Sequence, residues 1–403
     1  MNEKDLFGLA LGLVSPWHIE KIEFDAERKR LDLFLNFKRG SRFPCPECGE
    51  ESPVHDTTER TWRHLDFFQH QAYLTARVPR TNCNKCGVKQ VAVSWARPGS
   101  GFTLLFEALV LYLAQEMPVS SVAELTKVNQ MSIWRILERY VEAAVKAADL
   151  SGLKALGIDE CSKQKGHDYI TTFCDLDKSK VAYVAEGRGS DTLDSFTGHL
   201  KDKGLRPEQV EEVCCDMWPA YLSGIEKNLP EAAVTFDRYH VMAKMNKAVD
   251  EVRRREAREE TLLKETRYLW LKNPESLTKA QRRKLNGVKE QDLKTVRAYH
   301  IKLALQRFWE FTYMGAASRY LKKWYFWATH SRLEPVVEVA KLIKRHEEGI
   351  LRFLKSRITN GIVEGLNSKI KTALKRAYGF KSFEYYRTII YLVAGKLELP
   401  TRC

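Results

Sequence analysis

Residues 153–187 read LKALGIDECSKQKGHDYITTFCDLDKSKVAYVAEG, and this stretch decides the fold of the second half of the chain. Its segments LKALGID, DYITTFCDLD and KVAYVAEG have the composition of β-strands. A polar loop separates the first two segments, and a turn at 177–179 separates the last two. Consecutive strands with short connections usually pair as neighbours, so the stretch predicts a three-stranded meander.

The residues that follow the meander alternate between helix and strand. The pattern predicts a helix at 190–203, a fourth strand at 211–216, a helix at 219–229 and a fifth strand at 232–237. From about Val241 to Arg357 the chain is dense in Lys, Arg, Glu and Leu and predicts helices only. The last fifty residues predict basic helices.

The first 150 residues differ from the rest of the chain in composition and in the pattern of apolar residues. Residues 1 to about 100 alternate as short strands do, and we interpret the N-terminus as a helix and a strand rather than a signal peptide. RPGSG at 97–101 has the composition of a linker, and residues 102 to about 149 predict helices. No run approaches the roughly 18 apolar residues of a membrane span.

The balance of charge favours a polyanionic partner. The formal net charge is +14, and Lys and Arg release counterions from a phosphate backbone when they bind it. Basic metabolic enzymes and ribosome-associated proteins share this property, so charge alone does not identify nucleic acid.

Four of the nine cysteines predict one structural zinc site. They form two CxxC pairs, each followed by glycine: Cys45, Cys48, Cys83 and Cys86. Two such pairs complete a tetrahedral thiolate shell, which leaves no position for a substrate. Redox motifs, or a ligand set completed by His55 or His64, are the alternatives. The other cysteines suggest no disulfide framework, so we expect a reduced compartment, the cytoplasm.

Residues 118–141 predict a helix-turn-helix. Asn129 is a suitable N-cap, and apolar residues at helical spacing mark the buried face of the second helix. Four residues then lie near its exposed N-terminal end, where a recognition helix meets base edges: Gln130, Met131, Ser132 and Arg135. Lys127 occupies the place where such motifs usually carry glycine, and plain helical packing gives the same periodicity.

Two aspartates lie at the ends of predicted strands. Asp159 ends the first strand, and Asp216 ends the fourth. In an RNase H-like sheet these two strands are neighbours, so the carboxylates converge on one edge. Close carboxylates are costly unless cations screen them, which makes the pair a natural Mg²⁺ site. Aspartate is also common at strand ends and N-caps for purely structural reasons.

A third acid, Glu364, lies in ITNGIVEGLNSKIKTALKRAYGF at 358–380. On a helix, Glu364 shares one face with Lys371 and Lys375. Two asparagines lie close to that face, Asn360 and Asn367. A carboxylate with a basic track beside it suits a metal site next to DNA, although Glu–Lys steps are also common on solvated helices.

Three other residues compete with this trio. Glu160 adjoins Asp159 but points to the opposite face if the strand persists. Asp237 ends the fifth strand, and we interpret it as a residue that helps to position the substrate or the metal. His240 could aid catalysis, although a packed or capping role explains it more simply.

At this point four blocks of sequence resemble the ISL3 family of bacterial insertion-sequence transposases. They are 156–177, 213–254, 267–285 and 359–380. The family also begins with a zinc-binding domain and a helix-turn-helix, so the resemblance covers nearly the whole chain. It implies a DDE triad, and the matching positions are Asp159, Asp216 and Glu364. One departure is the plain CNKCG of the second cysteine pair, where many relatives carry a longer cysteine loop.

The resemblance also implies a multidomain α+β architecture, in which an all-helical insertion interrupts an RNase H-like mixed α/β catalytic core. The expected parts are a zinc-binding β domain at 1–100, a helix-turn-helix domain at 101–150, the first part of the core at 151–240, the helical insertion at 241–350, and C-terminal core helices carrying Glu364 at 351–403.

The implied function is that of a DNA transposase that binds terminal inverted repeats, cleaves them and transfers the strands to target DNA. Two Mg²⁺ or Mn²⁺ ions would act, with Asp159 bridging both and Asp216 and Glu364 each holding one. Lys371, Lys375 and Arg376 would grip the DNA end.

We expect a homodimer on double-stranded DNA, no membrane association, and a bacterial cytoplasmic protein at the nucleoid. The alternatives are a domesticated DNA-binding regulator that lost its chemistry, and a nuclease acting on RNA or hybrids.

Overall fold

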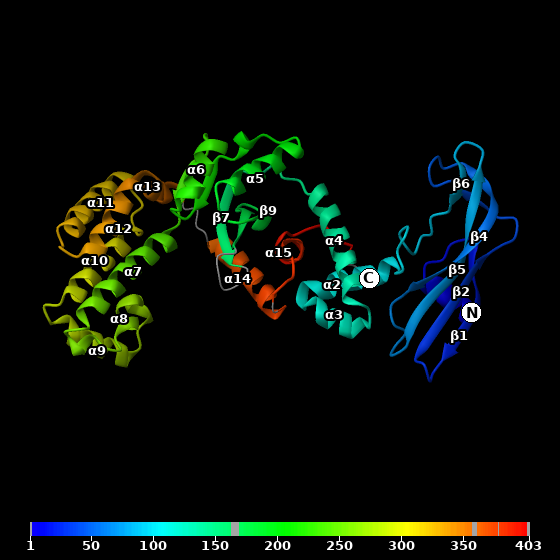
Figure 1. Ribbon diagram of the computed structural model, residues 1–403, viewed down its shortest axis with the longest axis horizontal. Helices are drawn as coiled ribbons and strands as arrows, with labels where there is room; N and C mark the ends of the chain where they lie inside the picture. The colour runs from blue at the N-terminus through cyan, green and yellow to red at the C-terminus, as the bar shows by residue number, and fades with distance from the viewer. Residues whose placement is uncertain (1, 163–168, 357–360, 378, 401–403) are drawn as a thin grey trace. The chain divides into compact units, whose positions relative to one another are not determined.

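The computed structural model describes residues 2–162, 169–356, 361–377 and 379–400. The chain divides into two compact units, Met1–Ala147 with Leu397–Cys403, and Ala148–Lys396 (Figure 1). The predicted strands, helices and their order are recognisable in both units, and each unit is described by itself.

The first unit begins with a β-sheet that follows one short helix, α1 (Glu3–Ala10). Its strands are β1 (Trp17–Asp25), β2 (Arg30–Phe37), β3 (Arg42–Pro44), β4 (Glu51–Arg63), β5 (Gln71–Cys83) and β6 (Gly87–Gln90). They lie in the order β1-β2-β5-β4-β3, and β6 pairs with β5. Alternate residues of β2 and β5, among them Leu33 and Leu74, are buried, as the period of two requires.

Three helices complete this unit: α2 (Leu104–Glu116), α3 (Val119–Thr126) and α4 (Gln130–Ala147). The segment that joins them to the sheet is packed, although its composition predicted a linker. Glu107, which is completely buried, accepts hydrogen bonds from Arg97, Ser100 and Tyr140. A buried carboxylate must be paired, and this one fixes the 97–101 segment against the helices.

The second unit is built on a five-stranded sheet of order β11-β10-β7-β8-β9. The strands are β7 (Ala155–Ser162), β8 (Tyr169–Asp175), β9 (Lys180–Glu186), β10 (Glu212–Cys215) and β11 (Ala233–Phe236). β7, β8 and β9 form the predicted antiparallel meander, while β10 pairs in parallel with both β7 and β11. The first and fourth strands of this unit are therefore neighbours, as expected.

Helices cover both faces of this sheet. α5 (Asp191–Asp202) and α6 (Pro219–Asn228) pack together, and their apolar residues share a core with Ile158 and Phe173. α14 (Gly361–Arg376) contacts β7, and α15 (Phe383–Ala394) contacts β9. An added Cβ at Gly157 would meet Val363 of α14, so α14 lies on the Gly157 face, opposite the Ile158 face.

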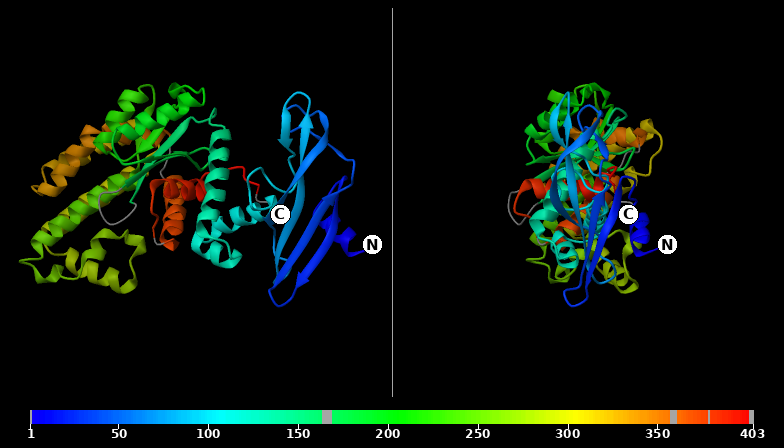
Figure 2. Two further views of the ribbon diagram at one scale, coloured as in Figure 1. Left: turned by 45° about the vertical axis from the view of Figure 1, so that its right-hand side comes forward. Right: turned by 90° about the vertical axis from the view of Figure 1, so that its right-hand side faces the viewer.

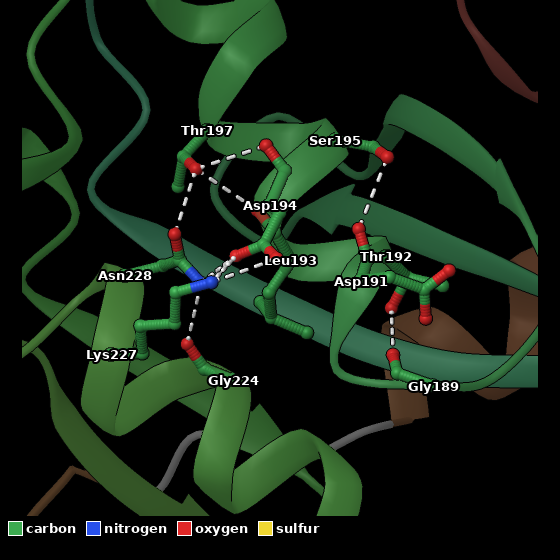
Figure 3. A network of polar contacts seen from close by, with 10 residues as sticks. All are labelled: Gly189, Asp191, Thr192, Leu193, Asp194, Ser195, Thr197, Gly224, Lys227 and Asn228. Atoms are coloured by element: carbon green, nitrogen blue, oxygen red, sulfur yellow. Dashed lines mark hydrogen bonds and ion pairs between the residues drawn. The ribbon is translucent and has the colours of Figure 1, made fainter.

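A polar network ties α5 to α6 beside their apolar contact (Figure 3). Lys227 donates to both carboxylate oxygens of Asp194 at 2.9 Å, and Asn228 donates to the same carboxylate at 2.7 Å. The hydroxyl of Thr197 donates to the side-chain oxygen of Asn228. The bonds cross from one helix to the other, so they set the register in which the two helices meet.

Gly224 permits the close approach of these helices, because a Cβ there would lie 2.9 Å from the side chain of Leu193. We expect Gly224→Ala to lower the free energy of unfolding by about 1–3 kcal/mol through overpacking. Gly198, inside α5, is the matched control: its Cβ would meet no atom within 4 Å. Gly198→Ala should be neutral or stabilising by up to about 1 kcal/mol in the same urea titration; equal effects of both changes would contradict the packing argument.

Between β11 and α14 the chain is helical in every regular element that the structure describes. The α-helices are α7 (Arg238–Glu256), α8 (Arg267–Leu271), α9 (Lys279–Lys289), α10 (Lys294–Phe308), α11 (Met314–Thr329), α12 (Glu334–Arg345) and α13 (Glu347–Ser356). Figure 2 shows α7 as a long helix that leads from the sheet into this region. Its interior is apolar, around Trp270 and Phe308. No described helix combines the length and apolar character needed to cross a bilayer.

Candidate functional site

Asp159 lies within β7 and not at its end, so that part of the prediction was wrong. β7 continues to Ser162 because β8 is long enough to pair with it as far as Tyr169. Asp159 stands opposite Thr172, and Glu160 stands opposite Thr171. Because the strand persists, Glu160 points to the other face of the sheet.

The face of β7 that carries Asp159 is covered by α14, and one hydrogen bond joins the two elements. Asn367 donates its Nδ2 to Asp159 Oδ2 at 2.6 Å. Asn367 is buried, and its side-chain oxygen has no hydrogen-bond partner among the described residues. Burial raises the pKa of Asp159, while the Glu160 amide, the charges of His240 and Lys371 and the Asn367 bond oppose that rise. Asn367 therefore orients this carboxylate.

Gly157 lets α14 come this close to the sheet. A Cβ there would clash with Val363 and lie 2.8 Å from Leu176. For the DNA strand cleavage that the family resemblance implies, we expect Gly157→Ala to push α14 away and to lower the rate about a hundredfold, since displacements of about 1 Å have that effect on catalysis. DNA affinity should stay unchanged in a gel-shift assay. Gly365→Ala, where a Cβ meets no atom within 4 Å, is the control and should cleave normally.

Asp216 follows β10 directly and is close to a histidine. Its Oδ1 accepts a hydrogen bond from the Met217 amide at 2.6 Å, and its Oδ2 lies 3.6 Å from His240 Nδ1. His240 Nε2 lies 4.0 Å from Asp237 Oδ2. The imidazole thus stands between two carboxylates.

Asp237 is buried and stands at the N-terminus of α7, yet its side chain makes no capping hydrogen bond. Its Oδ2 has no hydrogen-bond partner in the described part of the chain. A buried carboxylate oxygen without a hydrogen bond is costly, and the one charged partner given for it is the His240 imidazole at 4.0 Å. Asp237 remains a candidate for positioning the substrate or the metal.

Glu364 lies in the first turn of α14 and is exposed. Burial raises the pKa of its carboxyl, followed by the charge of Asp237; Asp159 acts in the same sense, and His240 and Arg238 oppose it. Glu364 therefore lies in the electrostatic field of Asp237 and Asp159. The three predicted carboxylates do not meet as closely as the zinc-domain cysteines do: among the described residues, only that cysteine group has potential metal-ligand atoms all within 4.8 Å.

Glu160, on the opposite face, has different neighbours. Burial raises its pKa, the charge of Arg188 lowers it, and Asp159 and Asp216 raise it further. The guanidinium of Arg188 lies over the rings of Tyr169 and Trp218. Glu160 thus faces a cationic and aromatic cluster rather than α14.

The predicted basic track lies on α14. Three residues of this helix are exposed: Lys371, Lys375 and Arg376. The positive charge of Lys371 lowers the pKa of Asp159. Asn360, predicted close to the same face, lies outside the described residues. The bond from Asn367 to Asp159 was not predicted. Asn367 follows Glu364 by three residues on the same helix, and this spacing places both side chains on one face, which could have indicated the contact.

The four paired cysteines meet at one point. Their sulfurs, from Cys45, Cys48, Cys83 and Cys86, all lie within 4.8 Å of one another. The backbone amides of Cys86 and Lys85 lower the pKa of Cys83 to about 6, whereas the neighbouring sulfurs of Cys48 and Cys45 raise the pKa of Cys86.

Neither histidine that the sequence offered as an alternative ligand takes part in this cluster. His55 lies beside Asp56, and His64 is hydrogen-bonded to Thr103. The donor set is four thiols, and it fits Zn²⁺.

The helix-turn-helix has the predicted form. Asn129 accepts a hydrogen bond from the Met131 amide, and Ile133 and Leu137 are buried in α4. The residues predicted to read DNA lie at the start of α4, three of them exposed and Ser132 half-buried: Gln130, Met131, Ser132 and Arg135. Lys127 adopts φ +55°, the left-handed conformation that glycine usually provides in such turns.

Comparison with known proteins completes this picture. A family model described as a transposase matches residues 156–390, which is more than half of the chain. The chain is a member of the ISL3 family of transposases. The helix-turn-helix domain of transposase family ISL3 matches residues 91–141, and the zinc finger of transposase IS204/IS1001/IS1096/IS1165 matches residues 41–86. The resemblance inferred from the four sequence blocks is confirmed.

Relatives of this ISL3 transposase align along nearly its whole length. The transposase for insertion sequence element IS1557 of Mycobacterium tuberculosis is 30% identical, over 95% of this chain and 93% of the relative. The transposase for insertion sequence element IS1001 of Bordetella parapertussis is 26% identical, over 94% and 95% respectively. The chain is accordingly a DNA-binding transposase, and its four paired cysteines form a structural zinc site.

Proposed function

We propose that this transposase is a DDE-type polynucleotidyl transferase whose catalytic carboxylates are Asp159, Asp216 and Glu364. The observation that carries the proposal is the bond from Asn367, on the helix of Glu364, to Asp159 at 2.6 Å. This bond anchors the helix of the third acid to the strand of the first. The parallel pairing of β7 with β10 supports the proposal further, since it makes the strand of Asp159 and the strand before Asp216 neighbours.

We also propose that the second unit is an RNase H-like core with a helical insertion. The strand order, with an antiparallel meander followed by two parallel strands on the β7 side, supports this assignment. The helices α7 to α13 stand between β11 and the helix of Glu364, as an insertion at that point requires. We propose the same domain boundaries that the sequence led us to expect, at about residues 100, 150, 240 and 350.

The carboxylates suit Mg²⁺ or Mn²⁺, which prefer hard oxygen ligands. Burial raises the pKa values of Asp159 and Glu364, and the charges of Asp237 and Asp159 raise that of Glu364 further, so a cation beside them would relieve unfavourable charge. Asp159 would hold both ions, and Asp216 and Glu364 one each. Bound there, two ions would supply activation of the attacking oxygen and stabilisation of the leaving 3′-oxygen.

The other residues of the site position these groups and the DNA. Asn367 holds Asp159 in one orientation, and His240 faces the Asp216 carboxylate. Lys371, Lys375 and Arg376 would neutralise phosphates of the DNA end near the cleavage point. Chemistry of this kind depends on placement and charge neutralisation more than on covalent participation of the protein.

The first unit would select the DNA. The start of α4 would enter a major groove of the terminal inverted repeat, with Gln130, Met131, Ser132 and Arg135 at base edges, and the zinc domain would bind beside it. Pairing two transposon ends, and then target DNA, requires at least a homodimer on DNA. We expect this to occur at the bacterial nucleoid, in the cytoplasm.

The test is cleavage of the element's own ends. The DNA that flanks the gene should contain short inverted repeats, and a labelled duplex carrying one repeat is the substrate. With Mg²⁺ the protein should nick at the repeat boundary, and with Ca²⁺ in place of Mg²⁺ it should bind without nicking. Specific binding with no nicking in Mg²⁺ or Mn²⁺ would favour the regulator instead, and preferential cleavage of RNA or hybrids would favour the nuclease.

A further inference from the structure

Three strands of the five-stranded sheet end at the same edge. β10 is parallel to β7, and β8 is antiparallel to both β7 and β9, so β7, β9 and β10 run in one direction. Asp216 follows β10 directly, and Arg188 follows the last residue of β9 by two positions. Ligands of open α/β sheets bind outside the carboxyl ends of the strands. Arg188 therefore lies at the edge of the sheet where we place the cleavage chemistry.

Trp218 connects the loops that leave this edge. It follows Asp216 by two residues and directly precedes Pro219, the first residue of α6. Its indole Nε1 donates a hydrogen bond to the backbone carbonyl of Arg188 at 3.3 Å. In the order of the sheet, β7 and β8 lie between β10 and β9, so this contact joins loops from strands that are not neighbours. Arg188 is thus tied to the loop that carries Asp216.

Aromatic rings hold the guanidinium of Arg188. Its central carbon lies 4.0 Å from the ring centre of Tyr169, the first residue of β8, and 5.0 Å from that of Trp218. Stacking on rings restrains the plane of a guanidinium and leaves the N–H groups at its edge free to donate. Arg188 is half-buried and Trp218 is 38% exposed, so solvent reaches this cluster.

The positive charge of Arg188 is not neutralised by an ion pair. Among the described residues, no carboxylate lies within 4.0 Å of its guanidinium, and none accepts a hydrogen bond from it. Arg188 lowers the pKa of Glu160, whereas Asp159 and Asp216 raise that pKa. These acids repel a phosphate, so DNA at this edge needs a cation that remains available. The fork of N–H donors in arginine matches two oxygens of one phosphate.

We propose that Arg188 binds a phosphate of the transposon end next to the phosphodiester that is cut, with Tyr169 and Trp218 as the positioning residues that hold its guanidinium. This inference rests on the proposed function, because it takes the cut to occur beside Asp159 and Asp216. Two hydrogen bonds from the guanidinium would fix the register of the DNA strand relative to the carboxylates. A role limited to offsetting the charge of Glu160 would involve no contact with DNA.

A methylphosphonate scan tests this contact by binding alone. Each phosphate near the repeat boundary is replaced in turn by a neutral methylphosphonate, and the affinity of the end is measured in Ca²⁺, without any need for cleavage. With the unaltered protein, replacement of one phosphate beside the boundary should weaken binding about tenfold or more, as the loss of charge-assisted hydrogen bonds does. With Arg188→Gln, the end should bind more weakly, and the same replacement should have no further effect. Arg188→Lys keeps the charge without the fork and should retain part of the sensitivity.

Three further variants separate this contact from a general effect on charge or folding. Arg206→Gln removes an exposed arginine of the same unit, outside the aromatic cluster, and should leave the sensitive phosphate unchanged. Trp218→Leu should reduce the sensitivity at that phosphate, and Trp218→Phe, which keeps a ring beneath the guanidinium, should restore most of it.

Two results would overturn the inference: no sensitive phosphate beside the boundary with the unaltered protein, or undiminished sensitivity of that phosphate with Arg188→Gln. The first result does not depend on whether a variant folds. Nicking in Mg²⁺ is scored separately on the same preparation. Its absence would count against the proposed function, while the scan in Ca²⁺ alone decides the role of Arg188.

Discussion

Asp159→Asn is expected to lower the rate of strand cleavage at a transposon end by about a thousandfold or more, with the affinity for that end unchanged. The substitution keeps the shape of the side chain and its bond to Asn367, but it removes the negative charge that would hold the proposed cations. Residues that act as one catalytic unit show losses of this size or larger when one is replaced. The measurement is single-turnover nicking of a labelled duplex in Mg²⁺, beside a gel-shift titration.

Asp175→Asn is the matched control. Asp175 also lies in this sheet and is completely buried, whereas Asp159 is half-buried; it stands at the far end of β8, opposite Leu156. Its replacement changes a buried charge of the same sheet without touching the candidate site, so cleavage should persist in the fraction that folds. Retained nicking by Asp159→Asn would overturn the assignment of the triad, whatever the control does.

Cys83→Ser is expected to abolish zinc binding and to unfold the zinc domain. Structural zinc contributes about 10–16 kcal/mol of apparent folding free energy in zinc-finger peptides, which equals or exceeds the about 5–15 kcal/mol that stabilises an ordinary domain. Cys83 ends β5, and its cluster joins the turn after β3 to the turn after β5. Zinc content by atomic absorption should fall close to zero, and specific binding of the end should be lost with it.

Two controls separate the zinc effect from a general loss of cysteine or histidine. Cys174→Ala removes a buried thiol from the second unit and should leave the zinc content intact. His64→Ala removes the hydrogen bond to Thr103 and should also retain zinc, because His64 is outside the cysteine cluster. X-ray absorption that detects nitrogen in the zinc shell would contradict the four-thiolate site.

Much of the fold could be predicted because local pattern and long-range structure agree here. The apolar segments around Ile158, Phe173 and Val184 each form a strand. The turn at 177–179 is short, so the strands that it joins pair as antiparallel neighbours. The doubled CxxC spacing was sufficient for the cysteine cluster, because only a shared ion gives that pattern a simple explanation.

The remaining features depend on contacts between distant segments, which a local pattern does not encode. The end of β7 was misplaced because pairing with β8, and not the composition of β7, determines where it stops. The packed 97–101 segment was misread because its glycines and proline resemble a linker, whereas the buried Glu107 holds it. The position of His240 between Asp216 and Asp237 follows from how α7 leaves β11, and spacing in the sequence does not specify it.

The Asn367–Asp159 bond joins positions 208 residues apart, and this separation has a consequence for synthesis. The ribosome releases the strand of Asp159 long before it makes α14, and α7 to α13 emerge in between. A chain that stops anywhere among those helices keeps the zinc-binding sheet and the helix-turn-helix but lacks the third acid and the asparagine that orients the first. Truncated products would occupy the ends of the element without cutting them, and each failed round of translation would restrain the complete enzyme.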